Sequence, residues 1–219
     1  MGAKAWYLPC LKAEQNYELK DLWISPSEYG LCLSCKPGGK LEQSRLILWC
    51  RAFRGCLLIR AFQQNRPDLQ KACLPMTDRP EEGQTTHKVE LNEFFPFPVV
   101  EEREWGAVSL FERAAVLTRE REYLPALYQA FQTLDSSGSW QDWLRRNWKA
   151  DGVEPFCQRA QYVMTEPEER SEIFSGEPRA IAPDEKQQLL ELWCRYFACQ
   201  ERPITGEHSV APTLFPQSV

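Results

Sequence analysis

The 219-residue sequence contains very little histidine, with only His87 and His208. General acid–base catalysis most often uses histidine, and serine or cysteine nucleophiles are usually activated by a neighbouring base such as histidine. His87 follows a polar loop and His208 lies in a stretch with little periodicity. A glycine-rich phosphate-binding loop is also missing from the sequence. These absences favour a non-catalytic protein, and we predict no catalytic residue and no cofactor.

Long apolar runs and a secretory leader are missing as well. No stretch of about 18 apolar residues is present, as a membrane-spanning helix requires. The first nine residues, with one lysine and a short apolar stretch, do not resemble a secretory signal. Nine cysteines, an odd number in a chain of this size, fit free thiols in a reducing compartment. The sequence therefore predicts a cytoplasmic protein with no membrane partner.

One cysteine motif has spacing that is typical of metal or redox sites, namely Cys32-Leu-Ser-Cys35. A zinc knuckle needs a second pair of ligands, and no other C-x-x-C pair occurs. Cys32 and Cys35 fall in a predicted strand, where alternation would point them to opposite faces. We therefore predict no metal site, and we keep a metal-dependent enzyme that uses Cys32 and Cys35 as an alternative function.

The composition is that of a globular protein, with 43% hydrophobic and 26% charged residues. The pattern changes near residue 105, from short apolar runs with turn residues to helical spacing. We predict an α+β fold with a small, mostly antiparallel sheet in residues 1–105 and helices in 106–202. The phenylalanine-rich joint at 94–100 is too apolar for a free linker, so the two halves are expected to share one core. Residues 203–219 are predicted to form a mobile tail.

Several short apolar runs in the first half indicate strands. Residues 5–8, 22–24 and 29–35 have this pattern, and 87–91 are expected to form an edge strand. The runs 45–51 and 56–62 flank Arg54-Gly55, which predicts a central β-hairpin. Because these two runs are apolar on both faces, a buried helix is the alternative interpretation.

The second half has clearer helix signals. Ser109 and Glu112 have the spacing of a capping box, which predicts a helix that begins at Ser109. Pro125 is expected in the first turn of a second helix, or at a kink in a single long one. A short helix is predicted from Ser139, with Trp140, Trp143, Leu144 and Trp148 on one side, and a last helix from 183 to 200.

The charge distribution is the most informative functional signal. Residues 45–71 carry six basic side chains against Asp68, whereas residues 76–105 carry eight acidic and three basic ones. Arginines interleaved with aromatic residues suit nucleic-acid backbones and stacked bases. The same arginines suit an acidic protein partner, and the basic and acidic segments could also neutralise each other within the fold. A second basic patch, Arg145, Arg146 and Lys149, lies opposite the tryptophans of the predicted short helix.

The sequence thus predicts a non-catalytic interaction or assembly protein with a protein partner. An accessory subunit of a ribonucleoprotein complex, docked on nucleic acid through the basic hairpin 45–71, is an alternative. The predicted binding residues are Arg45, Arg51, Arg54, Arg60, Trp140, Trp143, Arg145, Arg146 and Lys149.

Overall fold

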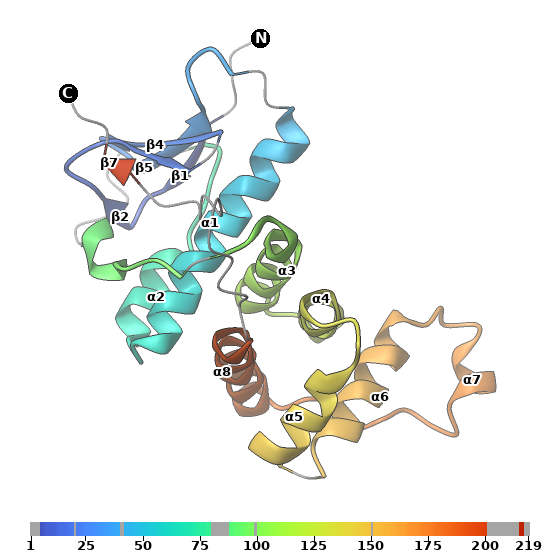
Figure 1. The fold of residues 1–219 in the computed structure, drawn as a ribbon. Helices are drawn as coiled ribbons and strands as arrows, with labels where there is room; N and C mark the ends of the chain where they lie inside the picture. Colours follow the sequence, from blue (N-terminus) through green and yellow to red (C-terminus); the bar gives the residue numbers. More distant parts are fainter. Residues whose placement is uncertain are drawn as a thin grey trace. The chain divides into compact units, whose positions relative to one another are not determined.

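The chain has the predicted α+β fold and divides into two compact units, with the boundary between Glu102 and Arg103 (Figure 1). The computed structural model describes residues 5–19, 21–39, 42–79, 88–98, 100–149 and 151–200, and the backbone of 215–216. The tail predicted over 203–219 lies outside the described residues except for 215–216. The shared core of the two halves stays a prediction.

The first unit contains an antiparallel sheet with the strand order β1-β5-β4-β3-β7. Leucine and isoleucine alternate with partly exposed residues along the central strands, so that one face of the sheet is buried. The strands predicted at 5–8, 22–24 and 29–35 are confirmed by β1, β4 and β5. The five strands are β1 (Trp6–Leu8), β3 (Tyr17–Leu19), β4 (Leu22–Ser27), β5 (Gly30–Cys35) and β7 (Phe215–Pro216).

A tight turn joins β4 to β5 at Gly30. The φ of Gly30 is 114°, a backbone conformation that residues with a side chain rarely adopt. A Cβ at this position would also collide with the carbonyl oxygen of Leu8 on β1. Glycine therefore lets β1 approach the start of β5. A second, parallel pair joins β2 (Leu11–Lys12) to β6 (Val89–Glu90), within the predicted edge strand.

The predicted hairpin is wrong, because residues 43–63 form one continuous helix, α1 (Gln43–Gln63). Its middle turns are buried on all sides, and Gly55 lies in that buried stretch. A fully buried segment has no amphipathic period, so the apolar pattern alone does not separate helix from strand. The helix contacts β4 and β5 and is followed by α2 (Pro67–Cys73), with proline at its first position.

The phenylalanine-rich segment packs its rings within the first unit. It follows the short 3-10 helix η1 (Leu91–Phe94). Phe95 lies with its ring centroid 5.9 Å from that of Tyr17 on β3, and Phe97 lies 5.9 Å from Phe53 on α1. These contacts explain why the segment is apolar: its rings cover the sheet and α1.

The second unit is helical, as predicted. Trp193 stacks on Phe111 at 4.4 Å and on Phe197 at 5.4 Å, and Phe131 stacks on Trp140 at 5.1 Å. These rings form its core. The elements are η2 (Glu102–Glu104), α3 (Trp105–Val116), α4 (Glu120–Leu134), α5 (Ser139–Asn147), α6 (Val153–Met164), α7 (Arg170–Ile173) and α8 (Pro183–Cys199).

Two helix boundaries differ from the prediction. Helix α3 begins at Trp105, so Ser109 lies in its interior, is buried, and caps nothing. Helix α4 begins at Glu120, so Pro125 lies beyond the first turn. The predicted starts of α5 and α8 are confirmed. Within the part of the chain that the structure describes, no helix is long and apolar enough to cross a membrane.

Candidate functional site

The four predicted binding arginines of residues 45–60 do not form one cluster, because α1 turns them to different sides. Arg54 is buried, and its Nη1 donates to the carbonyl oxygen of Leu74 at 2.9 Å. Arg60 is half-buried, with Nη2 3.4 Å from the carbonyl oxygen of Phe95. Both side chains therefore hold the first unit together. Only Arg45 and Arg51 keep guanidinium groups without a hydrogen bond or ion pair to another described residue.

Arg45 and Arg51 flank an exposed apolar side chain. Leu48 lies one helical turn from each of them, and 44% of its surface is exposed. Arg45 is exposed, Arg51 is half-buried, and Ile47 beside Leu48 is half-buried as well. We call Arg45, Leu48 and Arg51 the α1 face. It presents two cations around a large apolar group, which is the chemistry of an anchoring contact.

At the far end of the basic segment 45–71, Arg66 is paired with one carboxylate of that segment and one of the acidic segment. Arg66 donates to Asp68 at 2.6 Å and to Glu93 at 3.0 Å. The hydrogen bonds that Arg66 donates to Asp68 and Glu93 raise its pKa, so this exposed guanidinium is already engaged. The α1 face receives no such partner among the described acidic residues.

Two of the three cations of the predicted patch at α5 meet carboxylates of their own unit. Arg145 donates to Asp142 at 2.6 Å and to Glu154 at 2.7 Å, while Nε of Arg146 donates to the carbonyl oxygen of Asp142. Nζ of Lys149 lies 3.6 Å from a carboxylate oxygen of Glu185. Arg145 and Lys149 are therefore paired with carboxylates of the second unit, whereas the exposed Arg146 bonds only to a backbone carbonyl oxygen.

The predicted tryptophans of α5 are mainly core residues. Trp140 is 1% exposed, and Trp143 is half-buried, with its ring 5.2 Å from that of Tyr196 on α8. Asp135 fixes the start of α5, since its carboxylate accepts hydrogen bonds from the Tyr196 hydroxyl at 2.6 Å and the Ser139 hydroxyl at 2.6 Å. Burial pushes the pKa of Asp135 upward, but these hydrogen bonds and one from Ser137 outweigh it and hold the pKa well below its usual range.

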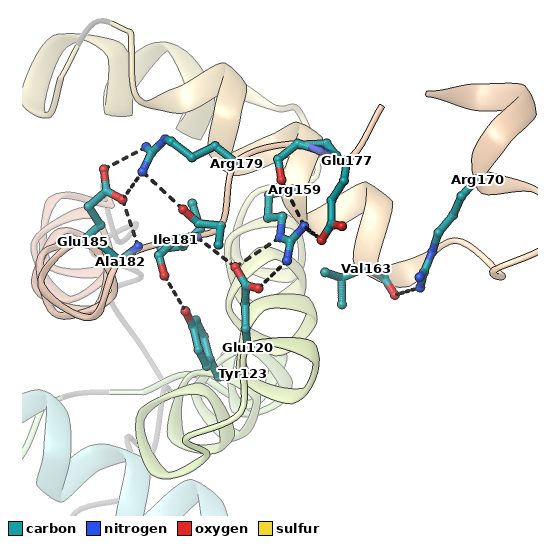
Figure 2. A network of polar contacts seen from close by, with 12 residues as sticks. Glu120, Tyr123, Arg159, Val163, Arg170, Glu177, Arg179, Ile181, Ala182 and Glu185 are labelled. Carbon is teal, nitrogen blue, oxygen red and sulfur yellow. Dashed lines mark hydrogen bonds and ion pairs between the residues drawn. The ribbon is translucent and has the colours of Figure 1, made fainter. Parts of the chain in front are cut away.

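A network of ion pairs that the sequence did not reveal holds the chain before α8 (Figure 2). Arg159 on α6 donates to Glu120 on α4 at 2.7 Å and to Glu177 at 2.6 Å. A second Glu120 oxygen accepts the backbone N–H of Ile181 at 2.8 Å. Burial raises the pKa of Glu120, and the hydrogen bonds from Arg159 and Ile181 lower it by more. Arg159 lies 39 residues from Glu120 and 18 from Glu177, and Ile181 lies 61 residues from Glu120, so no local spacing predicted these contacts.

A second group of hydrogen bonds and an ion pair lies at the start of α8 (Figure 2). Arg179 donates to both carboxylate oxygens of Glu185, at 2.7 and 2.9 Å, and Glu185 also accepts the backbone N–H of Ala182 at 3.0 Å. The Arg179 hydrogen bonds lower the pKa of Glu185 to about 2. The Glu185 carboxylate thus accepts hydrogen bonds both from the Arg179 guanidinium and from the backbone N–H before the first turn of α8. These hydrogen bonds hold the start of α8 in place, so we assign the network a structural role.

The segment between α6 and α8 holds the most exposed large apolar side chain in the described residues. Ile173 on α7 is 61% exposed, and Met164 at the end of α6 is 38% exposed. Figure 1 shows α7 on a loop beside α6. We call residues 164–173 the α7 surface.

The nine cysteines are free thiols. Both Cys32 and Cys35 lie on β5, three residues apart, so strand alternation directs them to opposite faces. Burial raises the pKa of Cys50 to about 12, which suits a packed thiol. Across the described part of the chain, no three metal-ligating side chains come together. The metal-dependent and nucleic-acid functions stay predictions.

Comparison with known proteins adds no relative: no family model, no curated protein and no solved structure matches this chain. Its function must therefore be inferred from its own residues.

Proposed function

We propose that this chain is a non-catalytic interaction or assembly protein of the cytoplasm, and that it binds an acidic protein partner through the α1 face. The observation that carries the proposal is the state of Arg45 and Arg51. They are cations beside the exposed Leu48, and neither is neutralised by another described residue. The other predicted binding residues are bonded or packed within their own unit.

The chemistry of this face suits a protein partner. Arginine forms bidentate pairs with carboxylates, and its planar guanidinium is weakly hydrated, so it is favoured at interfaces. Leu48 supplies apolar area between the two charges. A contact of this size is small, so the two charges serve mainly to steer and orient the partner.

Charge reversal on the α1 face tests the proposal. The variant Arg45→Glu/Arg51→Glu should lose the partners that the wild-type chain retains in affinity purification after nuclease treatment. A matched control is Arg113→Glu/Arg121→Glu, which reverses two exposed arginines of the second unit that have no side-chain partner among the described residues. The control should retain those partners.

Two results would contradict the proposal. One is the recovery of the same partners by the α1-face variant and the control. The other is the loss of all bound material on nuclease treatment, which would favour the ribonucleoprotein alternative.

A further inference from the structure

The α7 surface is strongly acidic. Residues 164–173 contain Glu166, Glu168, Glu169 and Glu172 against a single basic residue, Arg170. Side chains of all four glutamates are exposed, and none of them has a hydrogen-bond or ion-pair partner among the described side chains. Their charges therefore act on whatever approaches Ile173 and Met164.

Arg170 is turned away from this surface and fastens the segment to α6. Its Nε donates to the carbonyl oxygen of Thr165 at 3.0 Å, and its Nη2 lies 3.5 Å from that of Val163 (Figure 2). The guanidinium also lies 4.7 Å from the ring centroid of Tyr162. The single positive charge is thus used internally, and the outer face keeps its acidic character.

Phe174 holds the other end of α7 in place. Its ring packs edge-on against Tyr162 with a centroid distance of 5.3 Å. Its neighbour Ile173 is left outside, 61% exposed. The segment is therefore held in place on both sides of a largely exposed apolar side chain, as a preorganised docking site would be.

The α7 surface and the α1 face are complementary in both charge and apolar character. The segment 164–173 carries four exposed glutamates together with the exposed Ile173 and Met164, and the α1 face carries two arginines one helical turn on either side of Leu48. We propose that the α7 surface of one copy of this chain docks on the α1 face of a second copy. This inference rests on the proposed function, since it names a second copy as an acidic partner of that face.

Such a contact joins two different surfaces, so two copies can exchange it twice in a closed dimer, or further copies can add in a ring or an open series. In each case the mean mass in solution rises with protein concentration. Because the two surfaces are small, the contact is expected to be weak, with a dissociation constant on the order of 100 μM. Because charges on both sides contribute, raised salt should weaken it.

Complementation between two broken variants tests the contact. In Arg45→Glu/Arg51→Glu the α1 face is broken and the α7 surface is intact. In Ile173→Glu the α7 surface is broken and the α1 face is intact. Because Ile173 is 61% exposed, this change should leave the fold unaffected, and circular dichroism can check this. Sedimentation velocity of each purified full-length variant, at concentrations from about 10 to about 500 μM, should show monomers.

An equimolar mixture of the two variants should form one-to-one pairs and nothing larger, because each copy retains one working surface. Wild type and the Arg113→Glu/Arg121→Glu control should show masses above that of the monomer at low salt, which rise with protein concentration. Monomeric wild type over the whole range, or a mixture that stays monomeric, would overturn the inference. If wild type is monomeric but Arg45→Glu/Arg51→Glu still loses its partners in affinity purification, only this inference fails. If that variant also retains its partners in affinity purification, the proposed function fails as well.

Discussion

Helices α1 and α5 both carry cations on a helix face, but only Arg145 on α5 is paired with described carboxylates of its own unit. On α5, Arg145 is met by carboxylates of Asp142 and Glu154 within its own unit. On α1, Arg45 and Arg51 meet no described carboxylate. The difference teaches that a basic helix is a candidate interface only where its own chain does not neutralise it. It also separates residues that stabilise the fold from residues that are available to a partner.

The largest effect is expected from removing a core tryptophan that the sequence also allowed as an interface residue. Trp140→Ala should lower the free energy of unfolding by about 3–5 kcal/mol, because Trp140 is 1% exposed and its loss leaves a cavity. Urea denaturation gives the value. Leu48→Ala is the matched surface change, with an expected loss below about 0.5 kcal/mol. An equal loss of unfolding free energy in the two variants would contradict the assignment of Trp140 to the core and Leu48 to the surface.

A smaller loss is expected from breaking the Arg159 network. Arg159→Met should cost about 3 kcal/mol, because it leaves the Glu120 carboxylate without its cation in a largely buried site. Arg145→Met breaks an exposed, solvent-screened pair and should cost much less. Chemical denaturation of both variants compares them. A loss for Arg145→Met as large as that for Arg159→Met would contradict this ranking.

These two comparisons also show what the sequence could predict. The i,i+3 spacing of Asp142 and Arg145 is a local pattern that the sequence displays, and the structure has this ion pair; Trp140 and Leu144 of the predicted apolar side are buried. The pairing of Arg159 with Glu120 spans 39 residues and depends on how α4 and α6 pack, which no local spacing encodes.

Helix α1 was missed for a different physical reason. Strands β4 and β5 have one buried face and alternate, whereas α1 is buried around its middle turns and shows no period. Its length of 21 residues was the better signal, since one helix satisfies all its backbone groups internally where two short strands would need neighbours. The capping-box motif at Ser109 also misled the prediction. The motif is present, but the helix begins four residues earlier, at Trp105.

An effect that depends on pH is expected at the start of α8. The pKa of Glu185 is lowered from 4.5 to about 2, so its contribution to stability is complete above pH 4.5 and is lost as the pH falls toward 2. Glu185→Gln should therefore be less stable than wild type at pH 7, and the difference should shrink below pH 4.5. Urea midpoints measured at several pH values give this difference. A difference that does not change with pH would contradict the assignment.

The smallest effect on stability is expected at the α1 face itself. Arg45→Glu/Arg51→Glu should change the free energy of unfolding by less than about 0.5 kcal/mol, because neither guanidinium bonds to another described residue. Thermal melting of this variant beside wild type checks the value. A large loss would show that these arginines belong to the fold, as Arg54 does through its bond to Leu74.

The account depends above all on whether the α1 face is a contact surface, and site-specific photo-cross-linking tests this directly. A photoreactive side chain placed at Leu48 should form cross-links to protein in cells, whereas one placed at Arg113 should form few. The Arg45→Glu/Arg51→Glu change should abolish the cross-links from position 48. Cross-links of equal yield from both positions, or none from position 48, would contradict the account.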